Sequence, residues 1–132
     1  MEFLIHTDLL IEGILSDSPR AESVLELSLQ KEIRLWTLAS TLSIVRNQVV
    51  ALDPGTVSRL RHWLDTLAIL PITGREMKAA FLSEYNKLDY ELSGLAVKSF
   101  NLAGVLTLNP NVFAKQDVDA WSPEELPNVL SS

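Results

Sequence analysis

Short apolar runs alternate along the chain with longer segments in which apolar residues recur every three or four positions. A run of four or five apolar residues predicts a buried strand, because it is too short for a stable helix, whereas the longer pattern predicts helices that bury one face. The short runs predict strands at residues 3–6, 33–37, 68–72 and 104–108, and a weaker fifth strand at 118–121.

Capping residues mark the helix starts between these strands. Pro19 suits the first position of a helix, and Asp53 followed by Pro54 combines an N-cap with a proline at the first helical position. The spacing of a reciprocal capping box occurs at residues 73–76 and again at 122–125. Helices are therefore predicted to begin near residues 8, 19, 38, 54, 74, 89 and 123.

The same periodicity predicts which side of each helix faces the core. The inward stripes of the second and fourth helices include Leu29 and Leu64, respectively. The stripe of the helix that begins at Asp89 includes Phe100, and the helix before it has a stripe over residues 77–85. These side chains are expected to be buried against the sheet.

Strands separated by one or two helices pair in parallel through crossover connections. The expected fold class is therefore α/β, a three-layer α/β/α sandwich with a central, mostly parallel sheet of four to five strands, formed by one domain over residues 1–132. Ligands of such sheets bind beyond the carboxyl ends of the strands. The residues in that position are 6–8, 38–43, Thr73 and 107–109.

The composition narrows the possible chemistry. The chain has no cysteine, which excludes disulfides, cysteine zinc sites and thiol catalysis, and suits a reducing cytoplasm. With 11 basic and 17 acidic residues, the formal net charge of −6 argues against binding nucleic acid through a broad basic face. No apolar stretch approaches the roughly 18 residues of a membrane span, and the first residues lack the pattern of a signal peptide. We therefore expect a soluble, cytoplasmic domain.

Acidic residues near strand ends and helix starts are the main candidates for chemistry. Asp8 follows the first strand, and Asp89 and Glu91 lie at the start of a late helix. Carboxylates at helix starts are common caps, but several that converge at strand ends would bind Mg²⁺ or Mn²⁺. Of the two histidines, His6 is expected to make a hydrogen bond rather than to ligate a metal alone, and His62 to be solvated.

Five segments carry a set of motifs in a recognisable order. They are FLIHTDLLIEG (residues 3–13), LPIT (70–73), LDYELSGLA (88–96), TLNPNVF (107–113) and SPEEL (122–126). Together they resemble the PIN domains, the fold of VapC-type toxin ribonucleases. The resemblance implies an α/β/α fold in which three or four acidic residues hold one or two divalent ions that activate water against a phosphodiester. It also implies a prokaryotic toxin–antitoxin setting.

Most acidic positions of these motifs hold other residues in this sequence. The first acid, directly after strand one, falls on His6, and the mid-chain acid falls within residues 41–43. The second acid of the late pair falls on Leu92, whose place in an apolar stripe indicates core packing. The last acidic position of the motifs falls on Asn109 and Val112. The resemblance thus implies a vestigial pocket made of His6, Thr7, Asp8, Ser43, Asp89, Glu91, Leu92, Thr107 and Asn109.

Two functions remain open on these grounds. The first is a PIN-like pseudoenzyme that has lost its divalent-metal nuclease site and acts as a binding or interaction module, with no catalytic residue, metal or cofactor expected. Such a loss favours neutral replacements, because carboxylates clustered without an ion repel one another. The alternative is an endoribonuclease of the VapC toxin type, dependent on Mg²⁺ or Mn²⁺, with Asp8, Asp89, Glu91 and Asn109 as its site.

The expected partner is a protein, either a small antitoxin-like chain or a second copy of this chain as a homodimer. RNA is a further candidate ligand, and no membrane association is expected. Trp36, Trp63 and Trp121 are candidate interface aromatics, although a tryptophan in a domain of this size is more often partly buried in the core.

Overall fold

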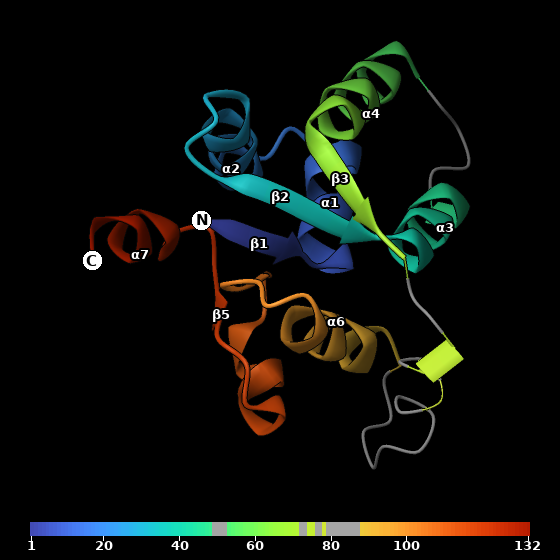
Figure 1. The fold of residues 1–132 in the computed structure, drawn as a ribbon. Helices are drawn as coiled ribbons and strands as arrows, with labels where there is room; N and C mark the ends of the chain where they lie inside the picture. The colour runs from blue at the N-terminus through green and yellow to red at the C-terminus, as the bar shows by residue number, and fades with distance from the viewer. Residues whose placement is uncertain (49–52, 72–73, 76–77, 79–87) are drawn as a thin grey trace.

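The computed structural model describes residues 1–132 except 49–52, 72–73, 76–77 and 79–87 (Figure 1). In chain order, the elements are β1 (Glu2–Ile5), α1 (Thr7–Leu15), α2 (Pro19–Leu29), β2 (Arg34–Leu38), α3 (Ala39–Gln48), α4 (Pro54–Thr66), β3 (Leu67–Leu70), α6 (Leu88–Ser99), β4 (Gly104–Leu106), the 3₁₀ helix η1 (Pro110–Gln116), β5 (Ala120–Trp121) and α7 (Leu126–Ser131). The capping box at 73–76 and the stripe at 77–85 lie largely outside the described residues.

The strands form one parallel sheet with the order β3-β2-β1-β4-β5. β1 lies at the centre, where Phe3 is aligned with Leu35 of β2 on one side and with Gly104 of β4 on the other. The predicted α/β fold with a parallel sheet is confirmed, and the weak fifth strand is present as β5. The second strand begins at Arg34 and the third ends at Leu70, so these bounds differ from the prediction by one or two residues.

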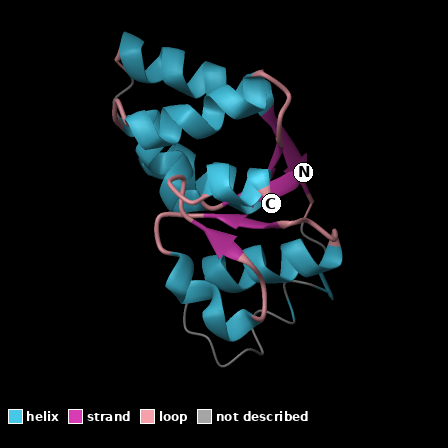
Figure 2. Ribbon diagram, turned by 90° about the vertical axis from the view of Figure 1, so that its left-hand side faces the viewer, coloured by secondary structure: helices cyan, strands magenta, loops and turns pink. Residues whose placement is uncertain are grey.

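Each face of the sheet carries its own hydrophobic core, because successive residues of a strand point to opposite faces. On one face, Phe3 and Ile5 pack with residues of α1, α2, α4 and α7. On the other, Leu4 packs with residues of α6 and η1. Figure 2 shows the helices on both sides of the strands. The sheet is thus covered on both faces, which is the usual condition of a parallel sheet.

Side-chain caps begin two of the helices; the cap at Asp53 was predicted, whereas at the start of α2 only Pro19 was predicted. The Ser18 hydroxyl accepts a hydrogen bond from the backbone amide of Ala21 at 3.3 Å, and Pro19 begins α2. The Asp53 carboxylate likewise accepts from the amide of Thr56 at 2.8 Å at the start of α4. These side chains satisfy amides that have no partner within the helix.

Three side chains that were predicted to face the core are exposed instead. Leu29 is 55% exposed and Phe100 is 38% exposed. Leu29 is the last residue of α2 and Phe100 follows the end of α6, so the chain turns away from the core at both. Leu64 is 44% exposed because its neighbour Trp63, which is fully buried, lies against Gly13 of α1.

The chain after β4 also differs from the prediction. β4 ends at Leu106 rather than at residue 108, because Thr107 and Leu108 turn toward Asp8 and donate hydrogen bonds to its carboxylate. The 3₁₀ helix η1, which no periodicity predicted, follows and is held in the core by the fully buried Phe113. Among the described residues, the helices are too short or too polar to cross a membrane.

Candidate functional site at the carboxyl edge of the sheet

The site lies where the strand order reverses. The chain leaves β1 toward β2 on one side and later returns as β4 on the other side of β1. The connections after two such strands diverge, and the space between them is the usual ligand site of a parallel sheet. Residues 6–8 follow β1 here, and residues 107–109 follow β4. The first turns of α6 cover the same edge, because α6 packs on both β1 and β4.

His6 is the buried centre of this edge. It is 1% exposed, and its Nδ1 lies 2.9 Å from the hydroxyl of Ser93. Its Nε2 lies 3.4 Å from the Asp89 carboxylate. Asp89 and Ser93 are four positions apart on α6, so both face the imidazole. The ring also stacks on Tyr90 with centroids 4.3 Å apart and meets the edge of Phe113 at 5.4 Å.

The imidazole of His6 is neutral near neutral pH. Burial lowers the pKa of His6 below its ordinary value, and this effect outweighs the opposing attraction of the carboxylates of Asp89 and Asp8. A neutral imidazole has one N–H. A proton on Nε2 lies beside the Asp89 carboxylate and leaves Nδ1 to accept a hydrogen bond from Ser93. The surroundings thus favour one tautomer.

Thr7 joins the same carboxylate to a second helix. Its hydroxyl donates to the other oxygen of Asp89 at 3.1 Å and lies 3.1 Å from the hydroxyl of Thr41 in α3. Because the Thr7 proton is given to Asp89, the Thr41 hydroxyl is the donor of the second bond. Asp89 is therefore approached by His6 at one oxygen and by Thr7 at the other.

Asp8 is bound to the connection that follows β4. One oxygen of its carboxylate accepts from the backbone amide of Leu9 at 2.6 Å. The other accepts from the Thr107 hydroxyl at 2.7 Å, from the amide of Leu108 at 3.2 Å and from the side chain of Asn109 at 3.4 Å. These four donors surround Asp8 on both of its oxygens.

Other residues of the pocket implied by the resemblance lie elsewhere. Leu92 is 2% exposed and belongs to the core on the α6 face of the sheet, as its stripe indicated. Ser43 is exposed on α3, and the residue of that helix that reaches the site is Thr41. Glu91 is buried on α6, but no hydrogen bond or ion pair joins it to residues 6–8.

Three residues of the site, Tyr90, Ser93 and Phe113, were not identified from the sequence, and Thr41 was placed at this edge only as part of the range 38–43. The one available signal concerned Ser93, which lies one helical turn after Asp89 and so shares its face. For Thr41 and Phe113, no local pattern distinguished a site residue from an ordinary helix residue.

The group of Ser93, His6 and Asp89 contains the side chains of a hydrolytic triad, but it lacks the required access. A nucleophilic serine must reach a substrate carbonyl. Ser93 is 1% exposed and bonds to the imidazole from within the core. The buried Ser93 therefore lacks the access that a nucleophile requires, and its hydroxyl joins α6 to His6.

The donor groups at this edge do not fit a divalent cation. Among the described residues, no three His, Cys, Asp or Glu side chains are grouped closely enough to hold a metal ion. Mg²⁺ and Mn²⁺ require several available oxygens. The carboxylates of Asp8 and Asp89 are already bonded to protein donors, and a buried imidazole lies beside the second of them.

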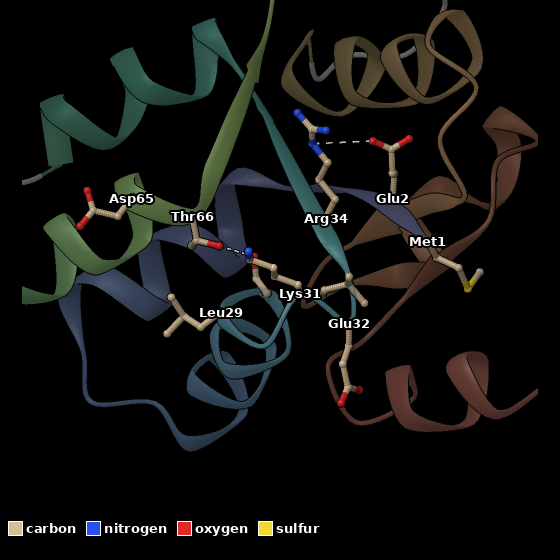
Figure 3. A pocket seen from close by; sticks show the side chains of 10 residues that line it. Met1, Glu2, Leu29, Lys31, Glu32, Arg34, Asp65 and Thr66 are labelled. Atoms are coloured by element: carbon tan, nitrogen blue, oxygen red, sulfur yellow. Dashed lines mark hydrogen bonds and ion pairs between the residues drawn. The ribbon is translucent and has the colours of Figure 1, made fainter.

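A separate hollow of about 740 Å³ lies at the opposite, amino edge of the sheet (Figure 3). Its lining carries charges of both signs, among them Lys31, Glu32 and Asp65. Arg34 on its rim lies 3.8 Å from the Glu2 carboxylate, and its guanidinium lies 4.5 Å from the ring centre of Trp36. Because the lining mixes acidic and basic side chains, the hollow presents no single chemistry to a ligand.

The comparisons with known proteins identify the fold. Neither protein-family models nor curated protein sequences match the chain. The crystal structure of VapBC2 from Rickettsia felis bound to a DNA fragment from their promoter is 16% identical, covers 92% of this chain and 98% of that chain, and has a TM-score of 0.67. The structure of FitAB bound to an IR36 DNA fragment is 19% identical over 93% of this chain and 95% of that one, with a TM-score of 0.63. The crystal structure of PAE2754 from Pyrobaculum aerophilum is 15% identical over 99% of this chain and 90% of that chain, with a TM-score of 0.61. These likenesses establish the fold.

Proposed function

We propose that this chain, a domain of PIN-like fold, has lost the divalent-metal nuclease site of that fold and acts as a protein-binding module. The observation that carries the proposal is the state of the first three residues after β1. His6 takes the place where the resemblance expects the first acid, and it is buried against Ser93 and Asp89. Asp8 and Asp89 are the carboxylates that remain closest, and both are bound by protein donors.

The energetics favour this reading over a weakened metal site. A cation would have to displace Thr107, Leu108 and Asn109 from Asp8 before it reached those oxygens. The buried Thr107 hydroxyl would then need a new partner, because leaving a buried donor unpaired costs about 1–3 kcal/mol. The ion would also need carboxylates from other elements. The late helix α6 presents Asp89, which already accepts from Thr7, while Ser93 faces His6 and Leu92 lies in the core.

The proposed partner is a protein. The solved structures of VapBC2 and FitAB share this fold, and the resemblance to VapC-type toxins points in the same direction. Trp36 and Trp121 are half-buried and so retain surface for a partner, whereas Trp63 is fully buried and takes no part. Aromatic residues of this kind are enriched at protein interfaces.

The alternative is an endoribonuclease that depends on Mg²⁺ or Mn²⁺. Its supporting observation is that Asp8 and Asp89 both lie within electrostatic range of His6, so two acids still converge on one edge of the sheet. In this alternative, the bonds described above would exchange for an ion when RNA binds. The two functions differ in a measurable way.

The test is a titration followed by a cleavage assay. Calorimetry of the purified chain with Mn²⁺ should show no site tighter than roughly millimolar, because too few free oxygens converge. Structured RNA incubated with the chain and either ion should remain intact. Cleavage that requires the ion and disappears in Asp8→Ala or Asp89→Ala, but persists in the control Asp65→Ala on α4, would establish the alternative.

A further inference from the structure

Three consecutive residues after β1 each bond to a different part of the fold. His6 contacts Ser93 and Asp89 of α6, and Thr7 bonds to Thr41 of α3 and to the same Asp89. Asp8 bonds to residues 107–109, between β4 and η1. The residues 6–8 and these partners are called the junction network below. It ties two helices and one connection to the central strand.

The inner part of the network is buried, whereas Asp8 and Asp89 are half-buried and Asn109 is exposed. His6, Thr41 and Ser93 are each 1% exposed, and Thr107 is fully buried. Hydrogen bonds polarise one another in such surroundings, and the loss of one partner leaves the other unsatisfied. A change at one bond is therefore expected to affect the rest of the network.

Asp89 shows how the network is organised. His6 lies against one oxygen of its carboxylate, and the Thr7 hydroxyl donates to the other. Asp8 is surrounded by donors in the same manner. A divalent cation holds carboxylates from separate elements together by offering them one positive centre. Here hydroxyl and imidazole protons offer the positive ends instead.

Resting on the proposed function, we infer that the junction network holds separate elements together as a divalent cation would: His6 holds α6 to the central strand, Thr7 holds α3, and Asp8, the next residue in the chain, holds the β4–η1 connection. The imidazole of His6 then takes the place that a divalent ion would occupy beside Asp8 and Asp89. The carboxyl edge is organised without an ion.

The first experiment asks whether the network acts as a unit. His6→Phe keeps an aromatic ring against Tyr90 and Phe113 but removes both nitrogens. The amides of Leu108 and Asn109 donate to Asp8 and Thr107, and neither bonds to His6. Native-state hydrogen exchange at these two amides should nevertheless become about tenfold faster, because Asp8 lies only two positions after His6 and loses its fixed position when the His6 bonds are lost. Exchange that changes only within α6 would overturn the inference.

A control separates coupling from general destabilisation. Thr56→Val removes a hydroxyl that accepts from Arg59 at the start of α4, away from the carboxyl edge. With urea chosen so that both variants have equal global stability, Thr56→Val should leave exchange at Leu108 and Asn109 near the wild-type rate. Equal acceleration in both variants would also overturn the inference.

The second experiment exchanges the imidazole for an ion. His6→Asp removes the contact with Ser93 and places a third carboxylate near Asp8 and Asp89, whereas His6→Asn removes the same ring without adding charge. Without metal, His6→Asp should melt at the lower temperature of the two. Added Mn²⁺ should raise its melting temperature with the logarithm of the ion concentration, while His6→Asn and the wild type should not respond. A His6→Asp variant that ignores millimolar Mn²⁺ would contradict the inference.

The two proposals fail in different ways. Stabilisation of the wild type by Mn²⁺, or RNA cleavage by it, would overturn the proposed function. A wild type that ignores the ion, together with exchange changes confined to α6, would overturn the junction network alone. Because His6→Phe retains the ring that fills the core, the exchange experiment holds even if His6→Asp does not fold.

Discussion

At the scale of single residues, His6 is the point where burial and charge act in opposite directions. Two carboxylates, those of Asp89 and Asp8, favour an imidazolium, but the loss of water around the ring outweighs them and the pKa of His6 is lowered. A protonated ring would also present an N–H on each nitrogen, so that Ser93 could only accept from it. Burial of the ring, rather than its bond pattern, therefore favours the neutral form by lowering the pKa of His6.

This lowered pKa predicts that acid destabilises the fold. In the unfolded chain His6 takes up a proton as the pH falls below the ordinary histidine value of 6.5, whereas in the folded chain it does so only at lower pH. The unfolded state therefore binds more protons within that window, and the free energy of unfolding decreases as the pH falls through it. Below the folded pKa both states are protonated and the loss stops.

The measurement is urea unfolding from pH 7.5 downward for the wild type and His6→Asn. The difference between their unfolding free energies isolates the His6 contribution, because asparagine does not titrate. We expect the wild type to lose stability relative to the variant as the pH falls below 6.5. A difference that stays constant, or that grows in favour of the wild type, would show that His6 is not held neutral.

Some residues of the candidate site could be predicted from the sequence and others could not. Residues 6–8 and 107–109 were placed at one edge because they follow predicted strands, and the carboxyl ends of parallel strands share an edge. Ser93 was not placed there, because a helical side chain points in a direction set by the rotation of its helix. One position along a helix turns that direction by about 100°, which is the difference between the buried Leu92 and the Ser93 that contacts His6.

At the scale of the elements, the crossing of α1 and α4 depends on one glycine. The indole of Trp63 lies so close to Gly13 that a Cβ there would be 2.7 Å from Cζ2 and 2.8 Å from Nε1. Glycine inside a helix costs about 1 kcal/mol relative to alanine. Full burial of a large aromatic side chain contributes at least as much, so the close approach is favourable overall. The same indole N–H has no hydrogen-bond partner among the described residues, which adds to the cost of this arrangement.

Gly13→Ala should therefore destabilise the fold even though alanine is the better helix former. We expect a loss of about 1–3 kcal/mol in the free energy of unfolding, since an extra methyl in a packed core forces its neighbours to move. Urea unfolding provides the measurement. Gly74→Ala is the matched control, because among the described residues nothing lies within 4 Å of the Cβ it would add.

The contact with Trp63 can be tested directly. Trp63→Phe removes the ring atoms nearest to Gly13, so Gly13→Ala should cost much less in that background than in the wild type. If the two substitutions are additive, then Trp63 is not what excludes a side chain at position 13.

At the scale of the whole molecule, the two cores are joined through shared strands. β1 contributes Phe3 and Ile5 to one face and Leu4 to the other. β4 does the same with Leu106 and Val105. If the helices on one face left the sheet, one face of β1 and β4 would become exposed, and the same strands also support the core on the other face. The two faces are therefore expected to unfold together.

This coupling predicts one cooperative transition. A variant with Trp36→Phe and Trp121→Phe retains Trp63 as its only tryptophan, and Trp63 lies in the core beneath α1 and α4. Its fluorescence reports on that face, while far-ultraviolet circular dichroism reports on all helices, including α6. The two urea midpoints should coincide. Distinct midpoints would mean that the α6 face unfolds separately.

The fold was largely accessible from sequence because its strands are short apolar runs separated by capped helices, and each pattern has its own period. Leu4 and Val105 lie in such runs, Pro19 begins α2 and Asp53 caps α4 as expected. The predictions that were wrong concern features that depend on tertiary packing, which a local sequence pattern does not contain. Leu29 and Phe100 are apolar at the right spacing, but they lie at helix ends where the chain turns, so they are exposed. η1 is held by tertiary packing of Phe113 and has no period to read.

The pairing of β1 with β4 has a consequence for how the chain is made. Phe3 is aligned with Gly104, so the central strand must wait for a neighbour that is translated about a hundred residues later. At the usual elongation rate this interval lasts roughly 5–20 seconds. During that time the apolar segment Phe3–Ile5 has β2 as a partner on one side, while its other side stays open on the ribosome-bound chain. The final architecture is therefore a late event in synthesis, and the newly emerged amino-terminal strand is the segment that chaperones would need to shield.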